Sequence, residues 1–107
     1  MINKNIQPLL NDLKLGLSDL YKNELDKIIL FGSYARGDEK SDSDIDVLIL
    51  LKNHHSFSNE VKKTLHFVYQ LNLKHDKVIS VFSDSVSNYK NLISPFYVNV
   101  KKEGVVL

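Results

Sequence analysis

Two aspartates at the start of an apolar segment are the residues of this sequence best suited to chemistry. Asp44 and Asp46 are separated by one residue and are followed directly by the apolar run Val47–Leu51. On a β-strand, residues i and i+2 point to the same face, with Cα atoms about 6 to 7 Å apart. Two carboxylates so placed repel each other, and a divalent cation that prefers oxygen ligands relieves the repulsion. The pair therefore predicts a site for Mg²⁺ or Mn²⁺.

A second group of residues lies at the end of the preceding apolar run, Ile28–Phe31. Gly32 permits close approach of the backbone to a ligand, and the Ser33 hydroxyl and nearby N–H groups can donate to phosphate oxygens. Arg36 adds a guanidinium suited to phosphate. Gly-Ser or Asp-x-Asp alone occurs in ordinary surface turns, but here they are separated by ten residues and each adjoins an apolar run. Together they predict an enzyme that uses a metal–triphosphate.

Helices and strands must position these residues, and the apolar pattern predicts where they lie. The first 24 residues carry apolar side chains at three- and four-residue steps, which predicts an amphipathic helix. Short apolar runs at 27–31 and 45–51 predict buried strands, and the polar segment 34–43 predicts a loop, with or without one helical turn. The stripe of the first helix comprises Ile6, Leu9, Leu10, Leu13, Leu17, Leu20 and Tyr21.

The second half of the chain predicts three further elements. Ser58 is the expected N-cap of a helix that runs to about Leu71, and the segment 77–82 is the expected third strand. Ser94 and Pro95 predict the start of a last helix, which Gly104 ends. The buried face of the middle helix is expected to carry Val61, Leu65, Val68 and Leu71, and the polar connection before it contains His54 and His55. The order α-β-β-α-β-α predicts an α/β fold, a small sheet with helices packed on it.

Length and composition exclude several classes of protein. A chain of 107 residues allows one domain, so residues 1–107 are predicted to form a single domain. The sequence contains no cysteine, which excludes disulfides, thiolate nucleophiles and cysteine-based zinc sites. No apolar run approaches the roughly 20 residues that a membrane-spanning helix needs, and a soluble cytoplasmic protein is expected. The net charge of +1 argues against direct binding of nucleic acid by bulk charge.

The spacing of Gly32-Ser33 and Asp44-x-Asp46 resembles the signature of the DNA polymerase β-like nucleotidyltransferase superfamily. The segments around it, 30–37 and 43–48, are similar to those of its smallest members, the minimal nucleotidyltransferases (MNT). The resemblance extends to the predicted first helix and to the closing segment 94–105. It implies a single α+β domain with a small mixed β-sheet.

The resemblance also implies an activity and a partner. Members bind ATP or another nucleoside triphosphate with Mg²⁺ and transfer the nucleotidyl group. By position, Asp44 and Asp46 would be catalytic and hold the metal, while Gly32, Ser33 and Arg36 would bind the nucleotide. Short MNT proteins act as antitoxins of HEPN-domain ribonuclease toxins, in which they modify a tyrosine with AMP. The resemblance therefore implies a hetero-oligomer with a HEPN protein.

One departure from the superfamily pattern concerns a third carboxylate on a later strand. The matching position falls near Ile79 or Ser80, and neither residue is acidic. Asp76 lies just before the predicted strand and Asp84 just after it, so either is a candidate, as is an ordinary role in a turn. The missing acid leaves open a second function, an antitoxin that neutralises its partner by binding alone.

The size of the chain bears on the acceptor of the nucleotidyl group. After Phe82 only 25 residues remain, too few for an added acceptor domain, which favours a partner protein over a small molecule or nucleic acid. A partner would dock on exposed apolar surface. The candidates are Phe96, Tyr97, Val105, Val106 and Leu107, although these residues could equally pack the last helix on the sheet.

Overall fold

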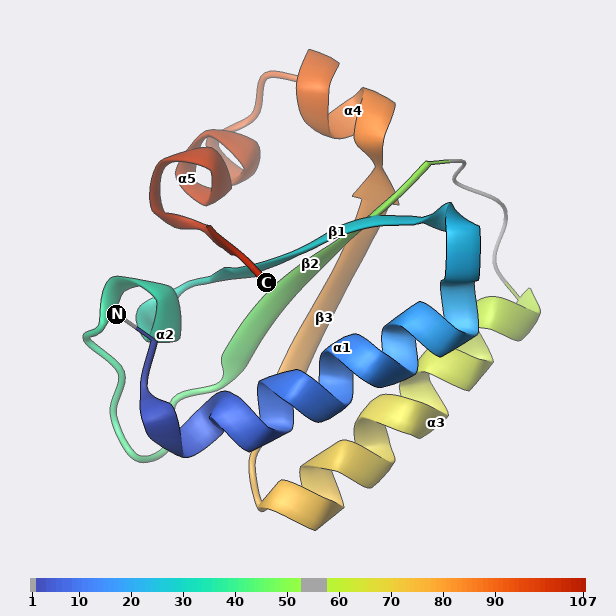
Figure 1. The fold of residues 1–107 in the computed structure, drawn as a ribbon. Helices are drawn as coiled ribbons and strands as arrows, with labels where there is room; N and C mark the ends of the chain where they lie inside the picture. The colour runs from blue at the N-terminus through green and yellow to red at the C-terminus, as the bar shows by residue number, and fades with distance from the viewer. Residues whose placement is uncertain (1, 53–57) are drawn as a thin grey trace.

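The protein is built on a four-stranded mixed sheet with the strand order β3-β2-β1-β4 (Figure 1). The computed structural model describes residues 2–52 and 58–107, with the side chains of residues 58–61 left out. Strand β1 (Leu25–Phe31) pairs antiparallel with β2 (Ile45–Leu51) and with β4 (Val105–Val106). Strand β2 pairs in parallel with β3 (Ile79–Ser85). The predicted mixed sheet is thereby confirmed.

Helices cover both faces of this sheet, as Figure 1 shows. The long helices α1 (Gln7–Tyr21) and α3 (Ser58–His75) lie side by side on one face. The shorter helices α4 (Val86–Asn91) and α5 (Pro95–Glu103) lie on the other. One helical turn, α2 (Ser33–Arg36), follows β1 directly. Two short 3-10 turns, Lys4–Ile6 and Lys22–Glu24, flank α1.

Alternation along the central strand β2 divides the core between the two faces. Ile45, Val47 and Ile49 are buried in the cluster that α1 and α3 cover. Leu48 and Leu50 point the other way, into a smaller cluster with residues of β1 and α5. Because side chains alternate along a strand, Asp46 lies on the α5 side, in line with this smaller cluster. The face that carries the candidate acids is therefore the one covered least by helices.

Several predicted boundaries and caps are confirmed. Pro8 lies in the first turn of α1, and the Ser94 hydroxyl accepts a hydrogen bond of 3.1 Å from the Tyr97 N–H at the start of α5. Helix α5 ends at Glu103, and Gly104 is its C-cap. In the helix stripe, five residues are buried, and Leu20 and Tyr21 are half-buried against them; the buried ones are Ile6, Leu9, Leu10, Leu13 and Leu17.

The prediction for the middle helix was partly wrong. Helix α3 continues to His75 rather than ending near Leu71. Leu65, expected in the core, is 60% exposed, and Thr64 is buried in its place. The Thr64 hydroxyl lies 2.6 Å from the Tyr21 hydroxyl, so burial leaves it hydrogen-bonded. Val68 and Leu71 are buried as predicted. The predicted histidine loop (His54 and His55), the capping role of Ser58 and the side chain of Val61 lie outside the described residues.

Other boundaries moved and two elements were missed. Strand β1 begins at Leu25, two residues before the predicted start. Strand β3 spans Ile79–Ser85 rather than 77–82, because Asn72 bonds the N–H groups of both Lys77 and Ile79 and holds the preceding turn. The short elements α4 and β4 lack enough residues to show a periodic pattern.

Within residues 2–52 and 58–107, none of the helices is both long and apolar enough to span a bilayer. A single domain over 1–107 stays a prediction.

Candidate functional site

The candidate phosphate-binding segment is a one-turn helix at the end of β1. Gly32 has φ 77° and ψ −157°, and Gly37, which ends the turn, has φ 83° and ψ 13°. Both conformations favour glycine. The Gly32 carbonyl accepts from the N–H groups of Ala35 and Arg36 at 3.1 and 3.0 Å. The chain therefore turns sharply away from the sheet, and the first N–H groups of this turn lack carbonyl partners within it.

Asp46 lies directly beside this turn because β1 and β2 are antiparallel neighbours. In the strand register Asp46 pairs with Phe31, the last residue of β1. A Cβ atom placed on Gly32 would overlap the Asp46 carboxylate. Glycine at this position is thus what lets the carboxylate and the turn approach each other. The Gly-Ser pair and the second aspartate, which the sequence predicts on opposing strand ends, meet as expected.

The two aspartates differ in environment. Asp44 is exposed and immediately precedes β2, while Asp46 is half-buried. Burial, and then the nearby Asp44 charge, raise the pKa of Asp46 above its usual value, against a smaller opposing effect of Arg36. A carboxylate whose ionised form is disfavoured in this way gains from a bound cation. The two oxygen-donor side chains suit Mg²⁺, which keeps several positions for water and phosphate oxygens.

No acid on β3 joins the pair. Ser80 is the residue opposite Asp46 in the parallel register, and its hydroxyl lies 3.5 Å from Asp44 Oδ2. Asp84 is opposite Leu50, four residues further along, which is about 13 Å away at the strand rise of about 3.3 Å. Its carboxylate accepts hydrogen bonds from Asn88 and from the Tyr97 hydroxyl. Asp84 therefore has a structural role at the other end of the sheet.

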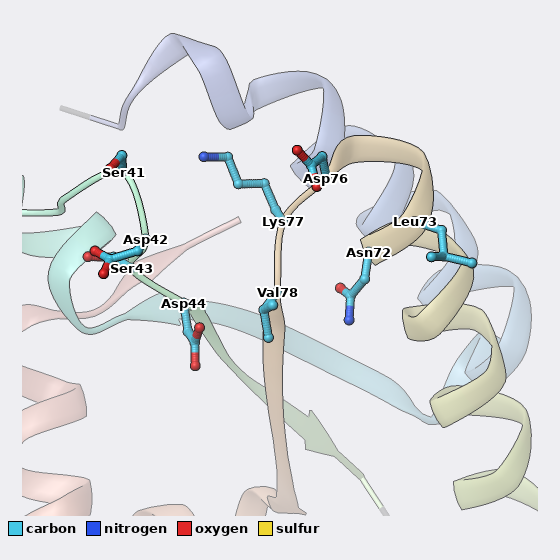
Figure 2. A pocket seen from close by; sticks show the side chains of 9 residues that line it. All are labelled: Ser41, Asp42, Ser43, Asp44, Asn72, Leu73, Asp76, Lys77 and Val78. Carbon is cyan, nitrogen blue, oxygen red and sulfur yellow. The ribbon is translucent and has the colours of Figure 1, made fainter.

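Asp76, the second candidate, lies in the turn before β3. Its φ of 52° is unusual for a residue other than glycine. Together with Asp44 and Lys77 it lines an open pocket of about 400 Å³. Figure 2 shows Asp76 and Asp44 apart from each other on different segments that line the pocket, with the Lys77 side chain extended toward Ser41. Among the described residues, no three His, Asp or Glu side chains are grouped to hold a metal ion.

Sequence reasoning missed one acid, Glu103. Its carboxylate accepts the Gly32 N–H at 3.3 Å and pairs with Arg36 Nη1 at 3.2 Å. Arg36 Nε pairs with Asp38 at 3.2 Å, and the hydrogen bonds that Arg36 donates to Asp38 and then to Glu103 raise the Arg36 pKa. The sequence suggested Glu103 only as the end of the last helix. Its place in the site follows from the pairing of the segment after Gly104 with β1, and that segment is too short to show a strand pattern in the sequence.

Comparison with known proteins identifies the family. The family model described as "Nucleotidyltransferase domain" matches residues 10–106. The chain belongs to this family. The nucleotidyltransferase is 38% identical over 91 residues to "Putative protein adenylyltransferase MJ0141" of Methanocaldococcus jannaschii, which covers 76% of this chain and 91% of the relative. It is 36% identical over 104 residues to "Putative protein adenylyltransferase MJ0604" of the same organism, with 96% and 98% covered.

Solved structures share the fold of this nucleotidyltransferase. A structure described as a "putative minimal nucleotidyltransferase" superposes with a TM-score of 0.62 at 20% identity and covers 95% of each chain. A toxin–antitoxin crystal structure with AMP-PNP gives a TM-score of 0.65 at 22% identity, with 90% of this chain and 69% of the other covered. An MNT antitoxin in complex with a tri-AMPylated HEPN toxin of Shewanella oneidensis gives 0.61 at 20% identity, covering 94% and 69%. The comparisons confirm the predicted fold, the resemblance to minimal nucleotidyltransferases and the assignment of the chain as a nucleotidyltransferase.

The geometry of this nucleotidyltransferase brings most of the expected residues to one end of the sheet. Gly32 and Ser33 follow β1, Asp44 precedes β2, and Asp46 is its second residue. Arg36 is present at the same turn, with Nε and Nη1 engaged by acids. A triphosphate lying over this end would have its phosphates near backbone N–H donors and a metal held by the two aspartates. That arrangement suits nucleotidyl transfer.

Proposed function

We propose that this nucleotidyltransferase transfers AMP from ATP to a tyrosine of a HEPN-domain toxin and thereby acts as its antitoxin. The observation that carries the proposal is the contact between the Gly32 turn and the Asp46 carboxylate. Support for a protein acceptor comes from the two relatives named as protein adenylyltransferases. Support for a HEPN partner comes from structural neighbours that are antitoxins, one of them bound to an AMPylated HEPN toxin.

Each proposed site residue has a stated task. Gly32, Ser33 and Arg36 bind the β- and γ-phosphates through N–H, hydroxyl and guanidinium groups. Asp44 and Asp46 hold Mg²⁺ (or Mn²⁺), which when bound lowers the cost of negative charge developing at the phosphates. The tyrosine oxygen forms a bond to the α-phosphorus, the bond from that phosphorus to the bridging oxygen breaks, and pyrophosphate leaves. The phenolic proton passes to solvent or to a base of the partner.

The test uses the purified pair with labelled ATP and Mg²⁺. Label should appear on the partner and vanish in the double variant Asp44→Ala, Asp46→Ala. Asp42→Ala is the matched control, because this exposed acid of the same loop is outside the proposed metal pair. Mapping the label to a tyrosine tests the acceptor. Label on another residue type, or none with the wild type, would contradict the proposal.

A second function, an antitoxin that acts by binding alone, is favoured by the residue opposite Asp46 on β3. That residue is Ser80 rather than a third acid. Under this alternative, the double aspartate variant still inhibits the partner and no label is transferred by either protein. We propose a cytoplasmic location and no direct nucleic-acid partner for both functions, in keeping with the net charge of +1.

A further inference from the structure

A glutamate from the far end of the chain reaches into the candidate phosphate-binding turn. Strand β4 pairs with β1 so that Val105 is opposite Leu30 and Val106 opposite Ile29. Glu103 ends α5 two residues before this strand, and its carboxylate accepts a hydrogen bond of 3.3 Å from the Gly32 N–H. The Glu103 side chain is 23% exposed, and Arg36 Nη1 lies 3.2 Å from each of its two carboxylate oxygens. One carboxylate therefore engages both the first residue and the last residue of the turn segment.

The backbone that carries Glu103 is firmly held. The Gly104 N–H donates to the Val100 carbonyl at 2.7 Å, and a Cβ on Gly104 would overlap that oxygen and the Ile29 side chain. Val100 is a residue of α5 itself and is buried against the sheet. Any larger residue at position 104 would move α5 away from the sheet. Glu103 is thus fixed by packing on β1 rather than by its contacts with the turn.

The turn, in contrast, is anchored in the core only at its middle, by the buried Tyr34 side chain. Helix α2 has four residues. Forming a first helical turn is unfavourable, since several dihedral angles are fixed for one hydrogen bond. Gly32, with no side chain, contributes only backbone contacts. Tyr34 therefore fixes the middle of the turn, while its two ends, Gly32 and Arg36, both contact the Glu103 carboxylate.

We propose that Glu103 is a positioning residue of the phosphate-binding turn, which it holds through the Gly32 N–H and Arg36. This inference rests on the proposed function of the turn. It assigns Arg36 a second task, since the side chain that is proposed to contact phosphate is also oriented by an acid from α5. The hydrogen bond from the Gly32 N–H to Glu103 thereby joins the proposed nucleotide site to the last helix, across 71 residues of sequence.

The experiment compares Glu103→Ala, Glu103→Gln and the control Asp19→Asn in the full chain. Asp19 is an exposed acid near the end of α1, so its change matches the loss of one charge away from the turn. Amide hydrogen exchange by NMR, without nucleotide, reports on the turn, and calorimetry with the non-hydrolysable analogue AMP-PNP and Mg²⁺ reports on binding. Far-ultraviolet circular dichroism verifies that each variant is folded.

In Glu103→Ala the hydrogen-bonded amides of Gly32 and residues 35–37 should exchange on the order of 5-fold faster, because a charge-assisted partner of the turn is lost. AMP-PNP should bind about 10-fold more weakly, as expected when a hydrogen bond to a charged group no longer orders the site. Glu103→Gln keeps an oxygen for the Gly32 N–H and loses the charge facing Arg36, so it should fall between wild type and Glu103→Ala. Asp19→Asn should match wild type in both measurements.

Two results would overturn the inference. The first is unchanged exchange of the turn amides in Glu103→Ala. The second is tighter AMP-PNP binding in either Glu103 variant, which would mean that the carboxylate competes with phosphate for the same donors. If wild type itself binds no nucleotide, the proposed function fails, and the exchange data alone decide whether Glu103 positions the turn.

Discussion

Replacement of Gly32 by alanine is the sharpest test of how the site is assembled. At φ 77° and ψ −157°, Gly32 occupies a region that other residues almost never adopt, at a cost of about 1–3 kcal/mol. The added methyl group would also overlap the Asp46 carboxylate. Because that carboxylate is the end of a side chain, it can rotate away. The overlap therefore displaces the Asp46 carboxylate within the site and has a smaller effect on the free energy of unfolding.

Gly37→Ala is the matched control, since the two glycines flank the same turn. Gly37 lies in the left-handed helical region at φ 83° and ψ 13°, where alanine costs about 1–2 kcal/mol. A Cβ atom there would meet nothing within 4 Å. Gly37→Ala should therefore lose some stability and keep its activity. The comparison separates backbone strain from displacement of the aspartate.

Urea denaturation and labelled AMP transfer to the partner measure the two effects. We expect Gly32→Ala to unfold at lower urea than Gly37→Ala, by up to about 2 kcal/mol in the free energy of unfolding. Transfer should fall by about 100-fold in Gly32→Ala alone, as expected when a reacting group is misplaced by about 1 Å. Equal transfer rates for the two variants would refute the reasoning, because of the two added methyl groups only the one at position 32 overlaps Asp46.

Three further predictions concern stability. Without metal, Asp46→Asn should raise the free energy of unfolding at neutral pH, because the raised pKa of Asp46 means that its charged form is disfavoured in the folded state. This gain should shrink as the pH falls toward about 3.9, where the unfolded carboxyl is protonated too. Urea denaturation of both proteins at neutral pH and at about pH 3.9 measures the difference. Gly16→Ala should lower the melting temperature, since its methyl would overlap the Phe67 ring and overpacking of about 1–3 kcal/mol exceeds the gain in helix propensity of about 1 kcal/mol. Leu71→Ala should cost about 2–5 kcal/mol in urea denaturation, while Leu65→Ala, at an exposed position, should stay within about 0.5 kcal/mol.

Each of these stability predictions has an outcome that contradicts it. An Asp46→Asn gain that grows as the pH falls would mean that the carboxylate is stabilised rather than disfavoured by its surroundings. A higher melting temperature for Gly16→Ala would show that α1 and α3 separate without cost. Equal losses for Leu65→Ala and Leu71→Ala would contradict the placement of Leu65 at the surface and of Leu71 in the core.

Local patterns predicted the parts of the fold that depend on local physics. Gly32 and Asp46 could be placed together because each adjoins a predicted buried strand and a single polar loop connects the two strands. The Ser94 cap and the Gly104 terminator were predicted because capping depends on a few neighbouring atoms. On α3 only Leu65 was wrongly placed in the core, because a buried Thr64 is acceptable only once the Tyr21 hydroxyl is known to be near.

Long-range pairing set the limit of what the sequence could show. Glu103 joins the site only because a two-residue strand, Val105–Val106, adds to the edge of β1. So short a strand has no periodicity of its own. The loss of Asp84 as a candidate acid likewise follows from the parallel register of β2 and β3, which the positions in the chain do not reveal.

The antiparallel pairing of β1 with β2 has a consequence for the order of folding. Gly32 and Asp46 belong to one hairpin, so their approach closes a short loop and can occur early, before distant contacts form. The contact of Glu103 with Gly32 spans 71 residues and closes a far longer loop. During refolding, Asp46 is therefore expected to reach the turn first, and the contact of Glu103 with Gly32 is expected to form last. Metal affinity would then develop before nucleotide affinity.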